Sequence, residues 1–162
     1  MLKYINTAIT FREIPDEITL CINLSRCEIH CKDCHSKYLW KDVGEELTSE
    51  VVDSLIKENT GITCICLMGG KDVSNIISYI KSKYKLQLAW YSGYDISTTL
   101  KQLNGIYPNY LKVGSYIKEL GGLDNPNTNQ RLYKIGTVID SNNKQELVLT
   151  DITYKLNSKE AH

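Results

Sequence analysis

Apolar residues in this chain fall into short continuous runs separated by stretches in which they recur every three or four positions. The runs contain many β-branched residues and end at glycine or polar residues, a pattern typical of strands that are buried on both faces. They occupy residues 18–24, 63–68, 86–91 and 110–113. We expect each run to be a strand of one sheet.

The stretches between these runs predict three amphipathic helices. Thr48 or Ser49 can cap the first, which carries apolar residues on one face until Asn59 and Gly61 end it. The other two predicted helices follow Asp72 and Asp95 as capping residues. Their apolar stripes are Val73, Ile76, Ile77 and Ile80 in one, and Ile96, Leu100 and Leu103 in the other.

Strands alternating with helices through short links indicate βαβ units and a parallel sheet. Residues 1–15 predict a strand or hairpin that ends near Pro15, and residues 131–139 and 146–154 predict a terminal hairpin around residues 141–143. A closed eight-unit barrel needs about 250 residues, whereas this chain has 162. We therefore expect an α/β fold, an open partial (β/α) barrel with a mostly parallel sheet and a C-terminal β-hairpin, as one domain over residues 1–162.

Charge and composition exclude several functions. Lysine and arginine number 19, as do aspartate and glutamate, so no overall field attracts nucleic acid or an anionic membrane. No stretch approaches the roughly 18 apolar residues of a membrane span, and the first residues lack the pattern of a secretory signal. We expect a cytoplasmic protein with reduced thiols, which binds neither nucleic acid nor membrane.

Six cysteines in such a protein favour metal or redox chemistry over disulfides. Cys21, Cys64 and Cys66 lie inside apolar runs and are expected to be buried small hydrophobes. The other three, Cys27, Cys31 and Cys34, fall within eight residues directly after the first long strand. Three thiolates this close can bind one soft metal centre.

Other segments are expected to meet this loop, because the carboxyl ends of parallel strands share one edge of the sheet. The predicted strands end at Gly69-Gly70, at Ser92-Gly93 and at Lys112 to Gly114. Cysteine ligands, glycines that let backbone approach a ligand, and a cation then converge on one rim.

Several metal or redox sites are compatible with the cysteine loop. Structural zinc would take His30, His35 or Cys21 as its fourth ligand, although zinc sites usually place two ligand pairs on separate turns. Cys31 to His35 fits the haem-attachment pattern, which needs export, and a thioredoxin-like pair of Cys31 and Cys34 leaves Cys27 unexplained. The remaining interpretation is a 4Fe–4S cluster with three protein ligands and one iron that the protein does not hold.

The cysteine spacing after a first barrel strand resembles the radical S-adenosylmethionine superfamily. Within it, the chain is similar to the small activating proteins of anaerobic (class III) ribonucleotide reductases. The motifs that carry this similarity are Cys27-x3-Cys31-x2-Cys34-His35, Tyr38-Leu-Trp40, Gly44, Met68-Gly-Gly70, Tyr91-Ser-Gly93, Tyr110-Leu-Lys112-Val-Gly114, Gly121-Gly-Leu and Thr128-Asn-Gln-Arg131.

This resemblance implies an enzyme with two cofactors, a 4Fe–4S cluster on Cys27, Cys31 and Cys34 and S-adenosylmethionine. Such an enzyme reductively cleaves S-adenosylmethionine to a 5′-deoxyadenosyl radical. The radical then generates a glycyl radical on the large subunit of the reductase. A flavodoxin- or ferredoxin-type protein is the implied electron donor.

The resemblance also implies a set of cofactor-binding residues. They are Asp33, Cys34, His35, Gly69, Gly70, Asp72, Ser92 and Lys112. Two positions depart from the family pattern: Asp33 stands where an aromatic residue is frequent, and Lys71 stands where an acid often holds the methionine amine. Two alternatives remain open, a superfamily member that acts on a small molecule and a zinc-stabilised binding domain.

Overall fold

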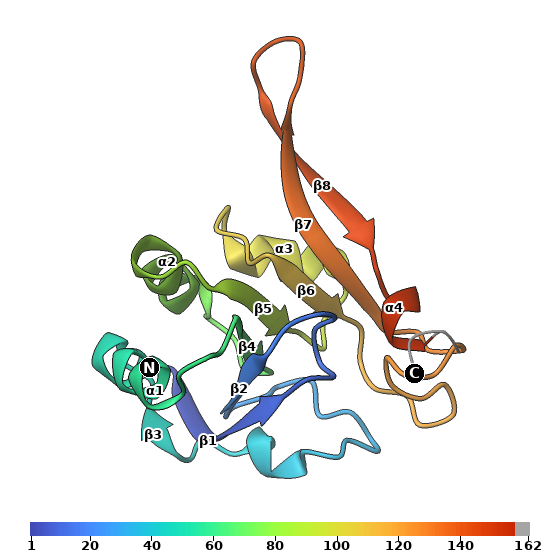
Figure 1. Cartoon of the computed structure of the whole chain (residues 1–162). Helices are drawn as coiled ribbons and strands as arrows, with labels where there is room; N and C mark the ends of the chain where they lie inside the picture. Colours follow the sequence, from blue (N-terminus) through green and yellow to red (C-terminus); the bar gives the residue numbers. More distant parts are fainter. Residues whose placement is uncertain (158–162) are drawn as a thin grey trace.

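Eight strands form one open sheet in the order β3-β1-β2-β4-β5-β6-β7-β8 (Figure 1). The computed structural model describes residues 1–157. Its strands are β1 (Lys3–Thr10), β2 (Thr19–Leu24), β3 (Glu45–Glu46), β4 (Cys64–Met68), β5 (Gln87–Tyr91), β6 (Tyr110–Val113), β7 (Arg131–Ile139) and β8 (Gln145–Asp151). The α/β class, the open sheet and the C-terminal hairpin are confirmed, and residues 158–162 of the predicted domain lie outside the described part.

The sheet is parallel only at its centre. Strands β2, β4, β5 and β6 pair in parallel, as the βαβ rhythm predicts. The remaining four pairings are antiparallel: β1 with β2 and β3, and β7 with β6 and β8. The expectation of a mostly parallel sheet is therefore correct for the core and wrong for the flanks, because the apolar pattern of a strand does not encode its direction.

Three helices link the parallel strands and cover one face of the sheet (Figure 1). They are α1 (Ser49–Glu58), α2 (Ser74–Lys83) and α3 (Ile96–Leu103). Successive strand residues point to opposite faces, so Ile22 and Ile65 pack under the helices. Cys21, Cys64 and Cys66 point to the other face and are buried there among apolar residues, as predicted.

Two of the three predicted helix caps are present. The side chain of Thr48 accepts a hydrogen bond from the Val51 N–H at 3.3 Å, and that of Asp95 accepts one from the Thr98 N–H at 2.8 Å. The prediction for Asp72 is wrong, since Val73 is the capping residue of α2. Asp72 has a φ of 56°, whereas a capping side chain requires extended backbone.

The terminal hairpin extends far beyond the rest of the sheet (Figure 1). Its first strand has the predicted bounds, but the second ends at Asp151 instead of residue 154 and is followed by the helical turn α4 (Tyr154–Asn157). Leu132 at the base is fully buried, whereas Ile139 near the tip is 70% exposed. None of the helices within residues 1–157 combines the length and apolar character that crossing a membrane requires.

Candidate functional site

The cysteine loop leaves the end of β2 and folds back along a 3-10 helical turn, η1 (Lys37–Trp40). The Cys27 N–H donates to the carbonyl of Leu39 at 3.0 Å, which fixes the start of the loop. Arg26 and His30 adopt positive φ values of 60° and 50°, so the chain reverses twice within a few residues. These reversals place the cysteines beside the carboxyl ends of β4, β5 and β6.

The three thiols line a single cavity of about 1340 Å³. Two of them accept backbone hydrogen bonds, Cys31 from the Tyr116 N–H and Cys34 from the Ser36 N–H, both at 3.3 Å. Within residues 1–157, no three His, Cys, Asp or Glu side chains stand close enough to hold one metal ion. An iron–sulfur cluster offers a separate iron to each thiolate, so three thiols spread around one cavity fit a cluster better than a single ion.

Glycines allow the loop and the sheet to approach each other. A Cβ on Gly93 would lie 2.8 Å from Cγ1 of Ile29 in the cysteine loop, and one on Gly69 would lie 3.9 Å from Cβ of Cys27. Gly69 and Gly70 both have positive φ, 75° and 69°, a region that glycine enters without steric cost. The loop, the turn after β4 and the turn after β5 are therefore packed as one wall.

Lys112 is a half-buried cation in this wall. Its Nζ donates to the carbonyl of Gly114 at 2.9 Å and to that of Ser92 at 3.4 Å. Burial lowers the pKa of Lys112 to about 8, against the opposing influence of the three loop cysteines. Lys112 lines the same cavity as the three thiols.

The two histidines of the loop have partners that are not metal ligands. His30 stacks on Trp40 with ring centroids 4.5 Å apart. Nε2 of His35 lies 3.0 Å from the hydroxyl of Tyr116. In this geometry neither histidine completes a tetrahedral zinc set with the three thiols.

The structure brings six of the predicted site residues to the cavity and leaves four outside its lining. Those at the cavity are Cys27, Cys31, Cys34, His35, Gly69 and Lys112, and those outside are Asp33, Gly70, Asp72 and Ser92. The Ser92 hydroxyl is buried, lies 3.0 Å from the Thr99 hydroxyl and accepts from the Tyr94 N–H at 3.2 Å. In this arrangement it holds the turn before α3 together.

Lys71 also lies outside the cavity lining. Its Nζ forms an ion pair of 2.5 Å with Oε1 of Glu28, and the Tyr94 hydroxyl donates to Oε2 of the same carboxylate at 3.5 Å. The ion pair raises the pKa of Lys71 and lowers that of Glu28. Lys71 thus ties the turn after β4 to the cysteine loop.

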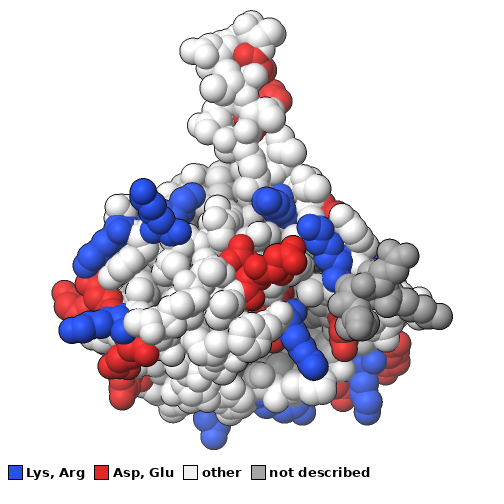
Figure 2. All heavy atoms as spheres, viewed as in Figure 1, with Lys and Arg blue, Asp and Glu red and all other residues white. Residues whose placement is uncertain are grey.

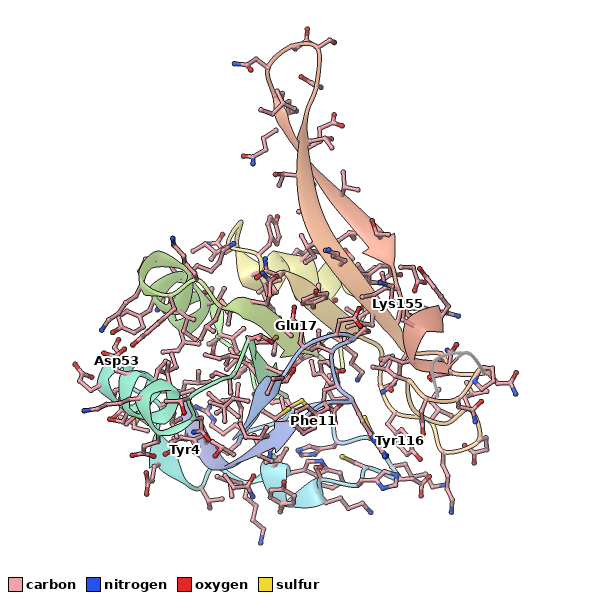
Figure 3. The ribbon with its side chains drawn as sticks, in the orientation of Figure 1. Tyr4, Phe11, Glu17, Asp53, Tyr116 and Lys155 are labelled. Carbon is pink, nitrogen blue, oxygen red and sulfur yellow. The ribbon has the colours of Figure 1, made fainter. Side chains whose placement is uncertain are left out.

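Tyr116 is a site residue that sequence reasoning missed. It reaches the cavity from the loop after β6, which the Asn129 side chain fastens by donating to the Ser115 carbonyl at 3.0 Å. In Figure 3, Tyr116, Phe11 and Lys155 mark three segments, distant in sequence, that line this cavity. Tyr116 lies two residues beyond Gly114, on the predicted rim, and this position is the signal that would have indicated Tyr116.

Glu13 was missed as well, and Gln130 was named only as part of a family motif and not as a site residue. Both line the cavity, and burial raises the pKa of Glu13. The Tyr91 hydroxyl donates to the Glu13 backbone carbonyl, which fixes the segment after β1 over the open face of the sheet. Nothing in the local sequence of Glu13 marks it, because its place depends on this long-range contact.

A family model described as a 4Fe-4S single cluster domain matches residues 18–120, more than half of the chain. The chain belongs to this family. The matched range of this 4Fe-4S single cluster domain contains all three loop cysteines, the glycine turns, Lys112 and Tyr116, and it ends before the terminal hairpin. No curated protein and no solved structure matches the chain. The match to the family model shows that the protein is an iron–sulfur protein.

Proposed function

We propose that this iron–sulfur protein reductively cleaves S-adenosylmethionine and generates a glycyl radical on anaerobic ribonucleotide reductase. The observation that carries the proposal is the shared cavity of Cys27, Cys31, Cys34, Gly69 and Lys112. At about 1340 Å³ it exceeds the roughly 300–1,000 Å³ of common ligand pockets. It has room for a cluster, an organic cofactor and part of a substrate.

The reaction divides between cofactor and protein. Cys27, Cys31 and Cys34 would hold the cluster, which would supply the one electron for reductive cleavage of S-adenosylmethionine to methionine and for hydrogen abstraction from a glycine Cα by the deoxyadenosyl group. The chain itself binds and orients the cofactors and the substrate, and it excludes water from them. A flavodoxin- or ferredoxin-type protein is the proposed source of the electron.

Lys112 is suited to bind the methionine carboxylate. It is half-buried, and within residues 1–157 its ammonium donates hydrogen bonds to backbone carbonyls alone. A carboxylate beside it would favour its charged form and oppose the effect of burial on its pKa. Gly69, which has no side chain, leaves space for the methionine backbone next to Cys27.

The methionine amine is proposed to bind groups other than residue 71. Since Lys71 is engaged by Glu28 outside the cavity lining, it does not repel the amine. Backbone carbonyls at the turn after β4 and the iron without a protein ligand are the proposed partners of this group.

The mouth of the cavity suits a polypeptide substrate. Phe11, at 70% exposure, and Tyr154, at 61%, both line it. Exposed aromatic side chains are enriched where proteins bind one another. A loop of the reductase that carries the target glycine is the proposed occupant.

The test combines anaerobically reconstituted protein, a reductant, S-adenosylmethionine and the candidate reductase. We expect 5′-deoxyadenosine and methionine to form, and a glycyl-radical doublet to appear in the electron paramagnetic resonance spectrum of the reductase. Cys31→Ala should abolish both, because it removes a cluster ligand. Cys64→Ala should retain both, because Cys64 is buried under the sheet away from the cavity lining.

Two outcomes would redirect the assignment. Cleavage of S-adenosylmethionine without a protein radical would favour the small-molecule alternative. A colourless protein that holds zinc after anaerobic purification would refute the radical chemistry altogether.

A further inference from the structure

The β7–β8 hairpin, residues 131–151 and called the arm below, projects from the body of the protein (Figure 1). In Figure 2 its outer part stands clear of the other elements, with a largely uncharged surface. Val138 is 48% exposed, Ile139 70% and Val148 38%. A two-stranded ribbon alone in water is only marginally stable, so an arm of this length indicates a binding surface.

The outer edge of β8 presents unpaired backbone groups. The Asp140 N–H donates to the Lys144 carbonyl and the Ile152 N–H to the Leu132 carbonyl, both at 2.9 Å. Hydrogen-bonded pairs alternate in an antiparallel ribbon, so the even-numbered residues of β8 bond to β7. The N–H and C=O groups that point outward belong to Gln145, Leu147, Leu149 and Asp151. Within residues 1–157, β8 has no neighbour on that side.

The middle of this edge lacks the features by which exposed edges avoid pairing, and the charged residues of β8, Glu146 and Asp151, lie toward its ends. Its register with β7 continues from Gln145 to Asp151 without a bulge, and the strand contains no proline. The side chains of residues 147–150 carry no charge. An unprotected edge strand of this kind is a template for a further strand.

The outward groups are symmetric about Val148. In an antiparallel pairing of two copies centred on this residue, Leu147 lies opposite Leu149 of the second copy, and Gln145 lies opposite Asp151. Every outward N–H and C=O then meets a partner. A shift of the centre to residue 147 or 149 leaves Asp151 or Gln145 without a partner in the strand.

We infer that two copies of the protein pair through the edges of β8, centred on Val148. The result is a four-stranded ribbon in the order β7-β8-β8-β7, which exceeds the roughly three strands needed for stability in water. The inference is independent of the proposed function, because it uses none of the cavity residues.

Side chains and charge fit this pairing. Ile135 lies opposite Leu149 in the arm, on the face that also carries Leu147, and pairing places these residues of both copies side by side. On the other face, Glu146 lies opposite the uncharged Thr150 of the second copy. The arm carries three basic and three acidic residues, so two arms have no net repulsion. A second copy is therefore the occupant that matches this edge.

Val148 provides the sharpest test, because its partner in β7 is Gly136 and its side chain has no cross-strand neighbour to lose. We expect the wild-type protein to sediment as a dimer at micromolar concentration. Val148→Glu and Val148→Lys should each weaken the dimer about tenfold or more, since like charges then face each other at the centre. An equimolar mixture of the two variants should restore the dimer, whereas Val148→Thr should leave it intact.

Variants at Leu149 distinguish the contribution of the backbone to the dimer from that of the side chain. Leu149→Pro removes an outward N–H that β7 does not use, and should abolish the dimer. Leu149→Ala keeps that N–H and should weaken the dimer less. Circular dichroism confirms that each variant remains folded.

A monomeric wild type would overturn the inference, as would a dimer that Val148→Glu leaves unchanged. Failure of the charge-swapped mixture to dimerise would overturn the register centred on Val148. If Val148→Glu instead impaired binding to the candidate reductase and not self-association, the arm would be a docking edge for that protein. None of these results alters whether S-adenosylmethionine is cleaved.

Discussion

At the scale of single residues, contacts between the cysteine loop and the sheet determine where the thiols lie. The side chain of Ile29, between Cys27 and Cys31, rests against Gly93 at the end of β5. The space for this contact exists only because residue 93 has no Cβ. The glycine therefore acts on the thiols through the loop.

Replacing this glycine should displace the loop. In Gly93→Ala the new Cβ would lie 2.8 Å from Cγ1 of Ile29, and we expect the free energy of unfolding to fall by about 1–3 kcal/mol through overpacking. The iron retained after anaerobic reconstitution and desalting should fall as well. Gly136→Ala is the matched control, because nothing lies within 4 Å of a Cβ at that position. Equal iron retention in the two variants would contradict this role.

Lys112 should give the cofactor-free protein a distinctive pH dependence. Its pKa is lowered from 10.5 to about 8 by desolvation, so below pH 8 the folded chain carries a partly desolvated charge that costs about 3 kcal/mol. Between pH 8 and 10.5 the unfolded chain binds more protons than the folded one, and stability rises with pH. We expect Lys112→Met to be more stable than wild type at pH 7 and to lack this rise.

Urea unfolding of both proteins across this pH range measures the difference. Other lysines and the thiols titrate in both proteins, so only the difference between their curves is assigned to Lys112. Parallel curves would show that Lys112 is not protonated differently on folding.

At the scale of elements, the ion pair of Lys71 and Glu28 joins the turn after β4 to the cysteine loop. Both side chains are partly exposed, 31% and 51%, and exposed ion pairs contribute little. We expect Lys71→Gln to change the affinity for S-adenosylmethionine, the proposed cofactor, less than threefold, as measured by equilibrium dialysis. Lys71→Glu should weaken it more by repelling Glu28, and adding Glu28→Lys should reverse the loss. A gain of affinity in Lys71→Glu would show that residue 71 faces the methionine amine of S-adenosylmethionine.

The sequence predicts elements well where the signal is local. Apolar runs identify the central strands, and Thr48 and Asp95 identify two helix starts. The prediction for Asp72 fails because the residue type favours a cap but does not indicate that the backbone there has a φ of 56°. Strand direction at the flanks is likewise set by long-range pairing.

The site follows the same division. The cysteines and Gly69 are visible from spacing, and the shared edge of parallel strands predicts that Lys112 joins them. Ser92 has the same apparent position, yet its hydroxyl turns toward Thr99. Rotamers and contacts such as that of Tyr116 with Cys31 depend on the folded chain and leave no pattern in the sequence.

At the scale of the whole molecule, the outer arm and the body should be separable. Replacing residues 137–147 by Asn-Gly would connect Gly136 to Val148, which pair in the arm, through a two-residue turn. We expect the shortened protein to be monomeric and to retain its iron and the proposed cleavage of S-adenosylmethionine. Its iron content and sedimentation coefficient test both expectations. Loss of iron would show that the outer arm supports the cavity.

The hydrogen bond between Cys31 and Tyr116 joins residues that are 85 positions apart. During synthesis the thiols leave the ribosome first, and the segment that completes their surroundings follows about 4–17 s later at common elongation rates. A nascent chain in that interval presents three thiols without the wall that encloses them. We therefore expect cofactor insertion to follow synthesis of residue 116, and oxidants that reach the growing chain to compete with it.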